Sequence, residues 1–374
     1  MGPGPSQVPP SVLAALSAPT VGHLDPAFLG LLDEVRSMLR SVLGTSHELT
    51  MPMSGTGSLG METCVVNLVE PGDAVLVGVH GVFGQRLAEV CRRAGADVTC
   101  AESPWGRALD VDLVRRSAAG RKFKLLCVVH AETSTGALTA LGPFRELADE
   151  LGALLLVDAV TSVGGVPVDV DAHRIDALYS GTQKCLSCPP GLAPISFGPR
   201  AREQLAARSH PVQSWYADLG LISRYWGGER LYHHTAPINM LYGLHEALRL
   251  CLVEGLAARY ERHRRLSRAL AAGLSALGLT LPVPEQERLP PLTLVEVPSG
   301  VDEARLRRCL LTRFQLEIGA GLGVFKGKAL RIGLMGESCN ERNVLLCLAA
   351  LEHALLEQGV RSGNSALAAA AALF

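Results

Sequence analysis

The chain has 374 residues, of which 48% are hydrophobic and 19% charged, and its formal net charge is −1. This length allows two domains with a large core, and the balanced charge gives no broad basic surface of the kind that binds nucleic acid. No apolar run reaches the roughly 20 residues of a membrane-spanning helix, and the first residues lack the basic and apolar regions of a signal peptide.

A glycine-rich stretch, SGTGSLG, occupies residues 54–60. Its glycines match the spacing of a dinucleotide-binding loop, but the preceding residues HELTMPM make a poor first strand for that fold. A phosphate cradle is the favoured alternative: Thr56 and Ser58 supply hydroxyls, and Gly57 lets backbone N–H groups approach a ligand at a helix N-terminus. A purely structural turn is the third interpretation.

Strand-like apolar segments then alternate with amphipathic, helix-like ones. The strand-like segments are 73–79, 124–132, 154–160 and 176–184. Continuous Val and Leu runs with intervening helices favour a parallel sheet that is covered on both faces. Because ligands of such sheets bind beyond the carboxyl ends of the strands, the residues that follow each segment are the candidates for a site.

Phe83 follows the first of these strands, and the hydroxyl residues 133–135 follow the second. An aromatic side chain in the position of Phe83 is usually core, but it can also stack on a flat heteroaromatic ring. Thr133 and its neighbours either cap a helix or hydrogen-bond to a polar ring.

Asp158 stands near the end of the apolar segment LLLVDAV. A carboxylate there needs a partner, because burying an unpaired charge is costly. Three partners remain open at this point: a protonated pyridine nitrogen, a metal ion, or an ordinary arginine or backbone N–H.

Lys184 closes the last strand-like segment, in YSGTQK. A lone lysine is usually solvated, but an amine at a strand end forms a Schiff base when its pKa is lowered. Cys185 and Cys188 have the spacing of a redox pair or half a zinc site, yet no second Cys-x-x-Cys and no His-x-x-x-His completes one. We therefore predict that both sulfurs serve packing and that there is no metal site.

Taken together, these strand ends provide what pyridoxal 5′-phosphate requires. They offer a phosphate cradle, a ring stacker, a carboxylate for the pyridinium nitrogen and a Schiff-base lysine. A long helical pattern over 244–278 then leads to a smaller α+β unit. We predict an α/β protein with an N-terminal segment over 1–15, a large, mainly parallel-sheet domain over 16–257 and a small C-terminal domain over 258–374.

Motifs along nearly the whole chain resemble those of the class V, fold-type I pyridoxal-phosphate aminotransferases. Within that family they are most similar to the alanine–glyoxylate and serine–glyoxylate (serine–pyruvate) group. The motifs that carry the resemblance are GPGPS from Gly2, SGTGSLGMET from Ser54, HAETSTG from His130, LLLVDAVTSVGG from Leu154, YSGTQK ending at Lys184, YWGGERLYHHTAP from Tyr225 and GLGVFKGKALRIGLMG from Gly321.

The resemblance implies a role for each candidate around the cofactor. Lys184 forms the Schiff base and later shuttles a proton, Asp158 pairs with the pyridinium nitrogen, and Phe83 stacks on the ring. Thr133 hydrogen-bonds near the ring oxygen. The residues implied to bind the phosphate are Thr56, Gly57, Ser58 and Gln183.

Four further residues receive roles from the same resemblance. Tyr232 and Thr235, in LYHHT, are implied to reach the cofactor phosphate of a neighbouring subunit, which requires a homodimer. Arg331 is implied to grip the substrate carboxylate with a bidentate pair, and Gly4 to line the substrate pocket.

The activity that the resemblance implies is ping-pong transamination of glyoxylate to glycine, with L-alanine or L-serine as amino donor. Ureidoglycine–glyoxylate aminotransferase is the alternative, because the pocket of the second substrate is not readable from one sequence. Cysteine desulfurases carry a histidine before their lysine, where this chain has Gln183. A nicotinamide-dependent oxidoreductase and a non-enzymatic binding protein are rivals from other classes.

The beginning of the chain departs from the family pattern. Relatives carry an arm before GPGPS that wraps the partner subunit, whereas Met1 directly precedes Gly2 here. A compact microbial form and a missing N-terminal segment both explain this.

We expect small amino and keto acids and a second copy of the chain as partners, and no membrane. We also expect an intracellular location, which would be the peroxisome or mitochondrion in a eukaryote and otherwise the cytoplasm.

Overall fold

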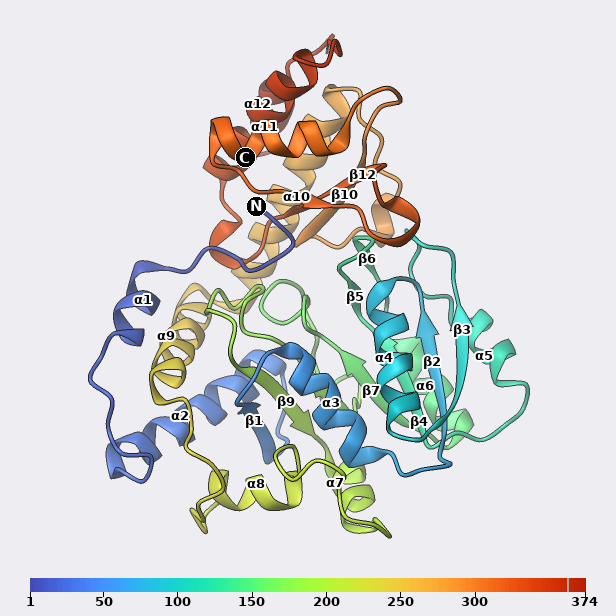
Figure 1. The fold of residues 1–374 in the computed structure, drawn as a ribbon, viewed down its shortest axis with the longest axis vertical. Helices are drawn as coiled ribbons and strands as arrows, with labels where there is room; N and C mark the ends of the chain where they lie inside the picture. Colours follow the sequence, from blue (N-terminus) through green and yellow to red (C-terminus); the bar gives the residue numbers. More distant parts are fainter. Residues whose placement is uncertain (362) are drawn as a thin grey trace.

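The computed structural model describes residues 1–361 and 363–374. It consists of a large body built on one sheet and a smaller body that sits above it in Figure 1. The first residues of the chain run between the two bodies, where the backbone N–H of Gly333 donates to the Met1 carbonyl at 2.8 Å. The N-terminus therefore belongs to the junction and contacts both bodies.

The central sheet has seven strands in the order β1-β9-β8-β7-β4-β2-β3. Strands β3, β2, β4, β7 and β8 are parallel, whereas β9 is antiparallel to both of its neighbours. The strands are β1 Leu49–Met53, β2 Ala74–Val79, β3 Asp97–Glu102, β4 Leu125–Val129, β7 Leu154–Asp158, β8 Ala177–Tyr179 and β9 Ala193–Phe197. A short hairpin of β5 Ala131–Glu132 and β6 Ala137–Leu138 follows β4.

Helices surround this sheet and enclose one hydrophobic core with it. They are α1 Pro10–Leu16, α2 Pro26–Leu43, α3 Gly57–Leu68, α4 Val82–Arg93, α5 Val111–Ala118, α6 Gly142–Leu151, α7 Pro199–Ala206, α8 Leu219–Trp226 and α9 Ile238–Glu254. Every residue of β4 and of β7 is buried, which explains their unbroken apolar sequences. The prediction of an α/β protein with a mainly parallel sheet, as in fold-type I enzymes, is confirmed.

The smaller body has a second core of its own. Its elements are α10 Leu256–Ala276, β10 Leu292–Glu296, α11 Glu303–Phe314, β11 Gly319–Ala320, β12 Ala329–Gly333, α12 Glu341–Leu356 and α13 Ala366–Ala371. The three strands form an antiparallel sheet, with β12 between the other two. The predicted domain boundary after residue 257 falls in the first turn of α10 and stays a prediction.

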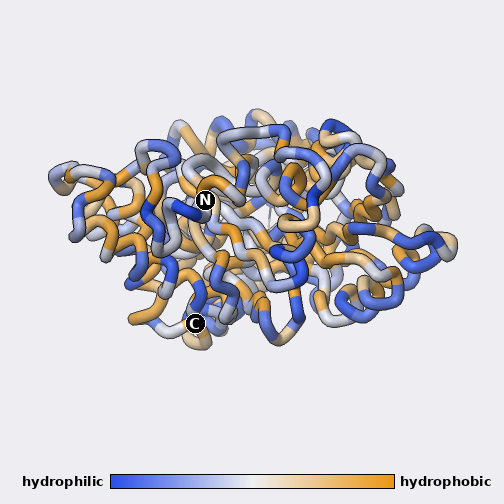
Figure 2. Tube along the Cα trace, turned by 90° about the horizontal axis from the view of Figure 1, so that it is seen from below, coloured by the Kyte–Doolittle hydropathy of each residue, from blue (hydrophilic) through white to orange (hydrophobic). Residues whose placement is uncertain are grey.

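Hydropathy follows the same division between interior and surface. Figure 2 shows hydrophobic stretches running through the middle of the molecule and hydrophilic ones at many of the outer loops. Among the residues that the structure describes, none of the helices combines the length and the apolar character that crossing a bilayer requires.

Candidate active site

A cavity of about 200 Å³ lies at the carboxyl ends of the parallel strands. Its lining residues are Thr56, Gly57, Ser58, Met61, Phe83, Arg86, Ala131, Thr133, Asp158, Val160, Tyr179, Gln183 and Lys184. Every residue predicted to hold the cofactor from within one chain is among them. A larger groove of about 690 Å³ runs along α10, but none of the predicted site residues lines it.

Asp158 is the last residue of β7 and is buried on the floor of this cavity. Its Oδ1 accepts a hydrogen bond from the backbone N–H of Val160 at 2.9 Å, and its Oδ2 accepts one from the Tyr179 hydroxyl at 2.7 Å. Burial raises the pKa of Asp158 to about 6, although both hydrogen bonds act in the opposite direction. The charge of Lys184 also lowers the pKa of Asp158, but no described residue forms an ion pair with this carboxylate, and a protonated ring nitrogen would supply that close partner.

Lys184 follows β8, the strand next to β7, so the two predicted reactive groups come from neighbouring strands. Burial lowers the pKa of Lys184 to about 8, and the charge of Arg331 acts in the same direction. The amine donates to the carbonyl oxygen of Pro3 from the N-terminal segment. An amine with this pKa is neutral far more often near pH 7 than a solvated lysine, and the neutral form is the nucleophile.

The glycine-rich loop leads into α3, whose first turn faces the cavity. Thr56 is the N-cap residue, but its side chain makes no capping hydrogen bond. The backbone N–H groups of Gly57 and Ser58 and the exposed hydroxyls of Thr56 and Ser58 can therefore donate to an anion, whereas the N–H of Leu59 donates to the Thr56 carbonyl at 2.8 Å. Gly57 packs closely against its neighbours, because a Cβ there would lie 3.3 Å from Val160 Cγ2.

The position of Phe83 is set by Glu132, which the sequence did not single out. The buried Glu132 carboxylate accepts from the backbone N–H of Phe83 at 3.2 Å and of Gly84 at 3.3 Å, at the start of α4. A carboxylate from another segment thereby caps this helix and fixes the ring at the cavity wall. Arg86 covers the ring, with its guanidinium carbon 4.9 Å from the ring centroid.

Arg331 reaches the junction from β12 of the smaller body. Its Nε donates to the Ala320 carbonyl at 2.8 Å and its Nη1 to the Thr133 carbonyl at 3.2 Å. Both acceptors are neutral backbone atoms. Burial lowers the pKa of the guanidinium, and the charge of the Glu132 carboxylate acts in the opposite direction. Thr133 also shares a 2.6 Å hydrogen bond between its hydroxyl and that of Thr161.

Gly4 lies against the Lys184 side chain, at a positive φ of 104°. A Cβ at this position would stand 2.7 Å from the Lys184 amine nitrogen. Ser6 anchors the same segment, because its backbone N–H donates to the Gln183 carbonyl at 2.8 Å and its hydroxyl to the Lys184 carbonyl at 2.8 Å. The N-terminal residues therefore form one wall beside the amine.

Tyr232 and Thr235 do not join the cavity of their own chain. Their hydroxyls lie 3.4 Å from each other, and both side chains are exposed, Tyr232 to 60%. Their role at the phosphate of a second subunit stays a prediction.

Cys185 and Cys188 are both buried. Burial raises the pKa of each thiol to about 12, so neither is a thiolate near neutral pH. Cys185 packs beneath the lysine and donates to the Thr161 carbonyl at 3.4 Å.

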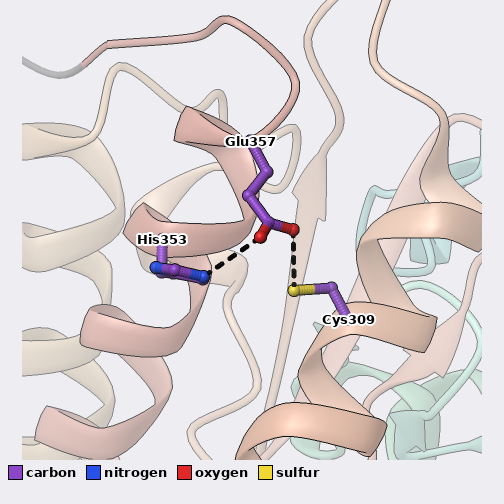
Figure 3. Close-up of side chains that lie close together, drawn as sticks. All are labelled: Cys309, His353 and Glu357. Carbon is purple, nitrogen blue, oxygen red and sulfur yellow. Dashed lines mark hydrogen bonds and ion pairs between the residues drawn. The ribbon is translucent and has the colours of Figure 1, made fainter.

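One group of three metal-ligating side chains occurs among the described residues, far from the cavity. Figure 3 shows Cys309 of α11 facing His353 and Glu357 at the end of α12. The positive charge of Arg313 already pairs with this group, because its guanidinium lies 2.7 Å from the Glu357 carboxylate and 3.0 Å from His353 Nε2. The group is therefore a neutralised ion pair on the surface of the small body.

Comparison with known proteins adds to this geometry. Residues 2–339 match the family model described as aminotransferase class-V. The chain is 41% identical over an alignment of 389 residues to the (S)-ureidoglycine–glyoxylate transaminase of Bacillus subtilis (strain 168), which covers 99% of this chain and 94% of the relative. It is 40% identical over 359 residues to the alanine–glyoxylate aminotransferase of Callithrix jacchus, at 95% and 87% coverage.

A solved structure agrees with these sequence matches. The crystal structure of an alanine–glyoxylate aminotransferase from Nostoc sp. superposes with a TM-score of 0.93 at 48% identity, and the match covers 95% of this chain and 94% of the other.

Proposed function

The chain belongs to the class V aminotransferases, which depend on pyridoxal 5′-phosphate, and from this premise we propose that it transfers an amino group to glyoxylate from L-alanine or L-serine. The observation that carries the proposal is the presence in one cavity of Lys184 and a buried Asp158 that forms no ion pair with any described residue. Small amino and keto acids are the substrates of such enzymes.

The cavity fits the cofactor by its own chemistry. Among the described residues Asp158 forms no ion pair, and the Thr56 side chain makes no capping hydrogen bond to the first turn of α3. We assign the ring nitrogen to Asp158, the ring face to Phe83, and the phosphate to Gln183 and the loop of Thr56 and its two successors.

Bound pyridoxal phosphate supplies an electron sink that acidifies the Cα–H bond of an amino acid. Lys184 would hold the cofactor through its amine and then take the proton from Cα, since it is the titratable amine in the lining. Arg331, whose charge has no anionic partner in its hydrogen bonds, would bind the substrate carboxylate and so orient Cα toward Lys184.

Small substrates follow from the wall formed by the N-terminal segment. The Pro3 carbonyl and Gly4 lie directly against the Lys184 amine, so little room remains for a side chain beyond Cα on that face. This favours alanine, serine and glyoxylate over larger amino and keto acids. Ureidoglycine remains the second candidate donor, because a relative named for it is as similar to this chain as those named for alanine.

We include a homodimer in the proposal. Tyr232 and Trp215 are exposed to 60% and 61%, and large exposed aromatic side chains mark interaction surfaces. A second copy that covers them would bring Tyr232 and Thr235 to the other subunit's phosphate. A single-chain mass in solution would contradict this part.

An absorbance titration tests the reaction itself. We expect the purified protein with pyridoxal phosphate to show a visible band that falls on addition of L-alanine and returns on addition of glyoxylate, because the two half-reactions interconvert the cofactor forms. The same titration with L-serine and with ureidoglycine ranks the donors. A band that responds only to ureidoglycine would replace alanine as donor, and a band that no amine changes would contradict aminotransfer.

Replacing Gly4 by alanine tests the wall beside the amine. A methyl group would collide with the Lys184 amine at 2.7 Å, and the backbone φ of 104° disfavours any side chain. We expect kcat/KM for alanine to fall about tenfold or more, since strain of this kind costs about 1–3 kcal/mol. Gly2→Ala is the matched control, because the nearest atom to its Cβ would be Glu317 Cδ at 3.5 Å. Equal kcat/KM values in the two variants would refute a close wall.

A further inference from the structure

A chain of hydrogen bonds runs from the protein surface to Ser54, the residue that begins the glycine-rich loop. His234 Nε2 lies 2.7 Å from Ser54 Oγ, and His234 Nδ1 lies 2.8 Å from His233 Nδ1. His233 Nε2 lies 3.3 Å from the Trp215 carbonyl oxygen, and the two rings stack with centroids 4.3 Å apart. Since Trp215 is exposed, the chain connects the surface to the entrance of the loop.

The hydrogen positions in this chain follow from the chemistry of neutral imidazole, which donates from one nitrogen and accepts at the other. A carbonyl oxygen only accepts, so His233 donates from Nε2 to Trp215, and its Nδ1 is an acceptor. His234 therefore donates from Nδ1, and its Nε2 accepts the hydroxyl proton of Ser54. Turning the His234 ring over would break both of its contacts, so its orientation is fixed.

The surroundings of His234 suit the neutral ring. Burial lowers its pKa, and the neighbouring His233 lowers it further. Within residues 1–361 and 363–374, neither histidine hydrogen-bonds to a carboxylate, and the ring of Tyr216 lies 5.0 Å from that of His234. The pair is therefore a neutral hydrogen-bond relay, and an ion pair plays no part in it.

Ser54 is held at two atoms by the same stretch of chain. Besides the contact of its hydroxyl with His234, its backbone carbonyl accepts a hydrogen bond from the Tyr216 hydroxyl at 2.8 Å. Ser54 stands directly between the end of β1 and the cradle that starts at Thr56. Fixing Ser54 thus fixes the point from which the cradle leaves the sheet, while His234 itself lines no part of the cavity.

We propose that His234 is a positioning residue for the cofactor phosphate, which acts by holding Ser54 and with it the loop 54–58. The proposal rests on the proposed function, since it takes the loop to be the phosphate site. It adds a residue that touches neither cofactor nor substrate. It also gives the segment 232–235, in which only Tyr232 and Thr235 are exposed, a second role within its own subunit.

Two substitutions of His234 separate its two contacts. The amide of His234→Gln reaches the place of Nε2 and can accept from Ser54, whereas the amide of His234→Asn reaches the place of Nδ1 and can donate only to His233. The measurement is the dissociation constant of the apoprotein for pyridoxal 5′-phosphate and, separately, for pyridoxal, which lacks the phosphate. We expect His234→Asn to weaken binding of the phosphate form about tenfold and to leave pyridoxal binding within about twofold, as loss of one hydrogen bond predicts. His234→Gln is expected to retain both affinities.

Ser54→Ala is the second variant, and it should reproduce the phosphate-specific loss even if His234→Asn folds poorly. His245→Asn is the matched control, because His245 makes a 2.6 Å contact with Glu34 away from the loop and should change neither affinity. Equal losses for pyridoxal and its phosphate would show a general structural role and overturn the proposal, as would unchanged affinities in both His234→Asn and Ser54→Ala. A wild-type protein that binds neither compound would instead refute the proposed function.

Discussion

Replacing Lys184 by alanine is expected to reduce transamination by at least about a thousandfold, since a positioned acid–base group contributes up to about 10⁴ in rate. The variant loses both the covalent anchor and the group that moves the proton at Cα. Lys184→Arg should be equally inactive, because a guanidinium keeps the charge but cannot act as a nucleophile near neutral pH. The measurement is the steady-state rate with alanine and glyoxylate.

The lowered pKa of Lys184 also predicts how cofactor capture depends on pH. With a pKa of about 8, roughly a tenth of the Lys184 amine is neutral at pH 7. The wild-type apoprotein should therefore capture pyridoxal phosphate faster as pH rises toward 8, and the two variants should show no such rise. Lys328→Ala is the matched control, because Lys328 is exposed. Activity of Lys184→Ala close to that of the control would sink the assignment.

Replacing Asp158 by asparagine is expected to separate activity from stability. Activity should fall about a hundredfold to a thousandfold, because an amide cannot stabilise a protonated ring nitrogen. The apoprotein, in contrast, should become more stable at pH 7.5. The reason is that the wild-type carboxylate is buried and charged at this pH, and that it forms no ion pair with any described residue until the cofactor arrives.

The pH dependence fixes the sign of this stability effect. The folded carboxyl of Asp158 holds its proton more tightly than the unfolded one, since its pKa rises from 3.8 to about 6. Its contribution to stability is full below pH 4 and is lost as pH rises through about 6, an effect of about 3 kcal/mol at most. Urea unfolding of both apoproteins should therefore show a gap in stability at pH 7.5 that narrows as pH falls through 6 and closes below pH 4.

Asp176 provides the matched control for that experiment. It is buried like Asp158, but its carboxylate lies 2.7 Å from the Arg145 guanidinium. Asp176→Asn should destabilise the apoprotein at pH 7.5, because it leaves a buried arginine incompletely paired. If Asp158→Asn destabilised the apoprotein as much as Asp176→Asn does, Asp158 would have to be paired already, and its assignment to the ring nitrogen would lose its basis.

The proposed reactive pair, Lys184 and Asp158, could be predicted from the sequence because both residues stand at strand ends. Strands β4 and β7 are buried on both faces, so they read as unbroken apolar runs that end abruptly at polar residues. Parallel strands with helical connections bring such ends to one edge of the sheet. Asp158 and Lys184 are thereby predicted to be neighbours without any knowledge of packing, whereas the glycine-rich loop is recognised by the spacing of its glycines.

Three other strands of the sheet, β1, β3 and β9, do not show such an apolar run in the sequence. Strand β3 lies at one edge and exposes Asp97 and Glu102, and β1 lies at the other edge and contains Pro52, so neither reads as a buried strand. Strand β9 was missed as well, because its short sequence APISF is interrupted by Pro194 and Ser196.

The sequence by itself determined the sheet type, the cofactor class and the residues at the strand ends, since these depend on local periodicity and chain order. Only the tertiary structure decided what supports them. Tyr179 and Glu132 hold the carboxylate and the stacking ring, the N-terminal segment walls the amine, and His234 reaches Ser54 across 180 positions. Contacts over such separations arise from tertiary packing, mostly within the large body, and no local pattern encodes them.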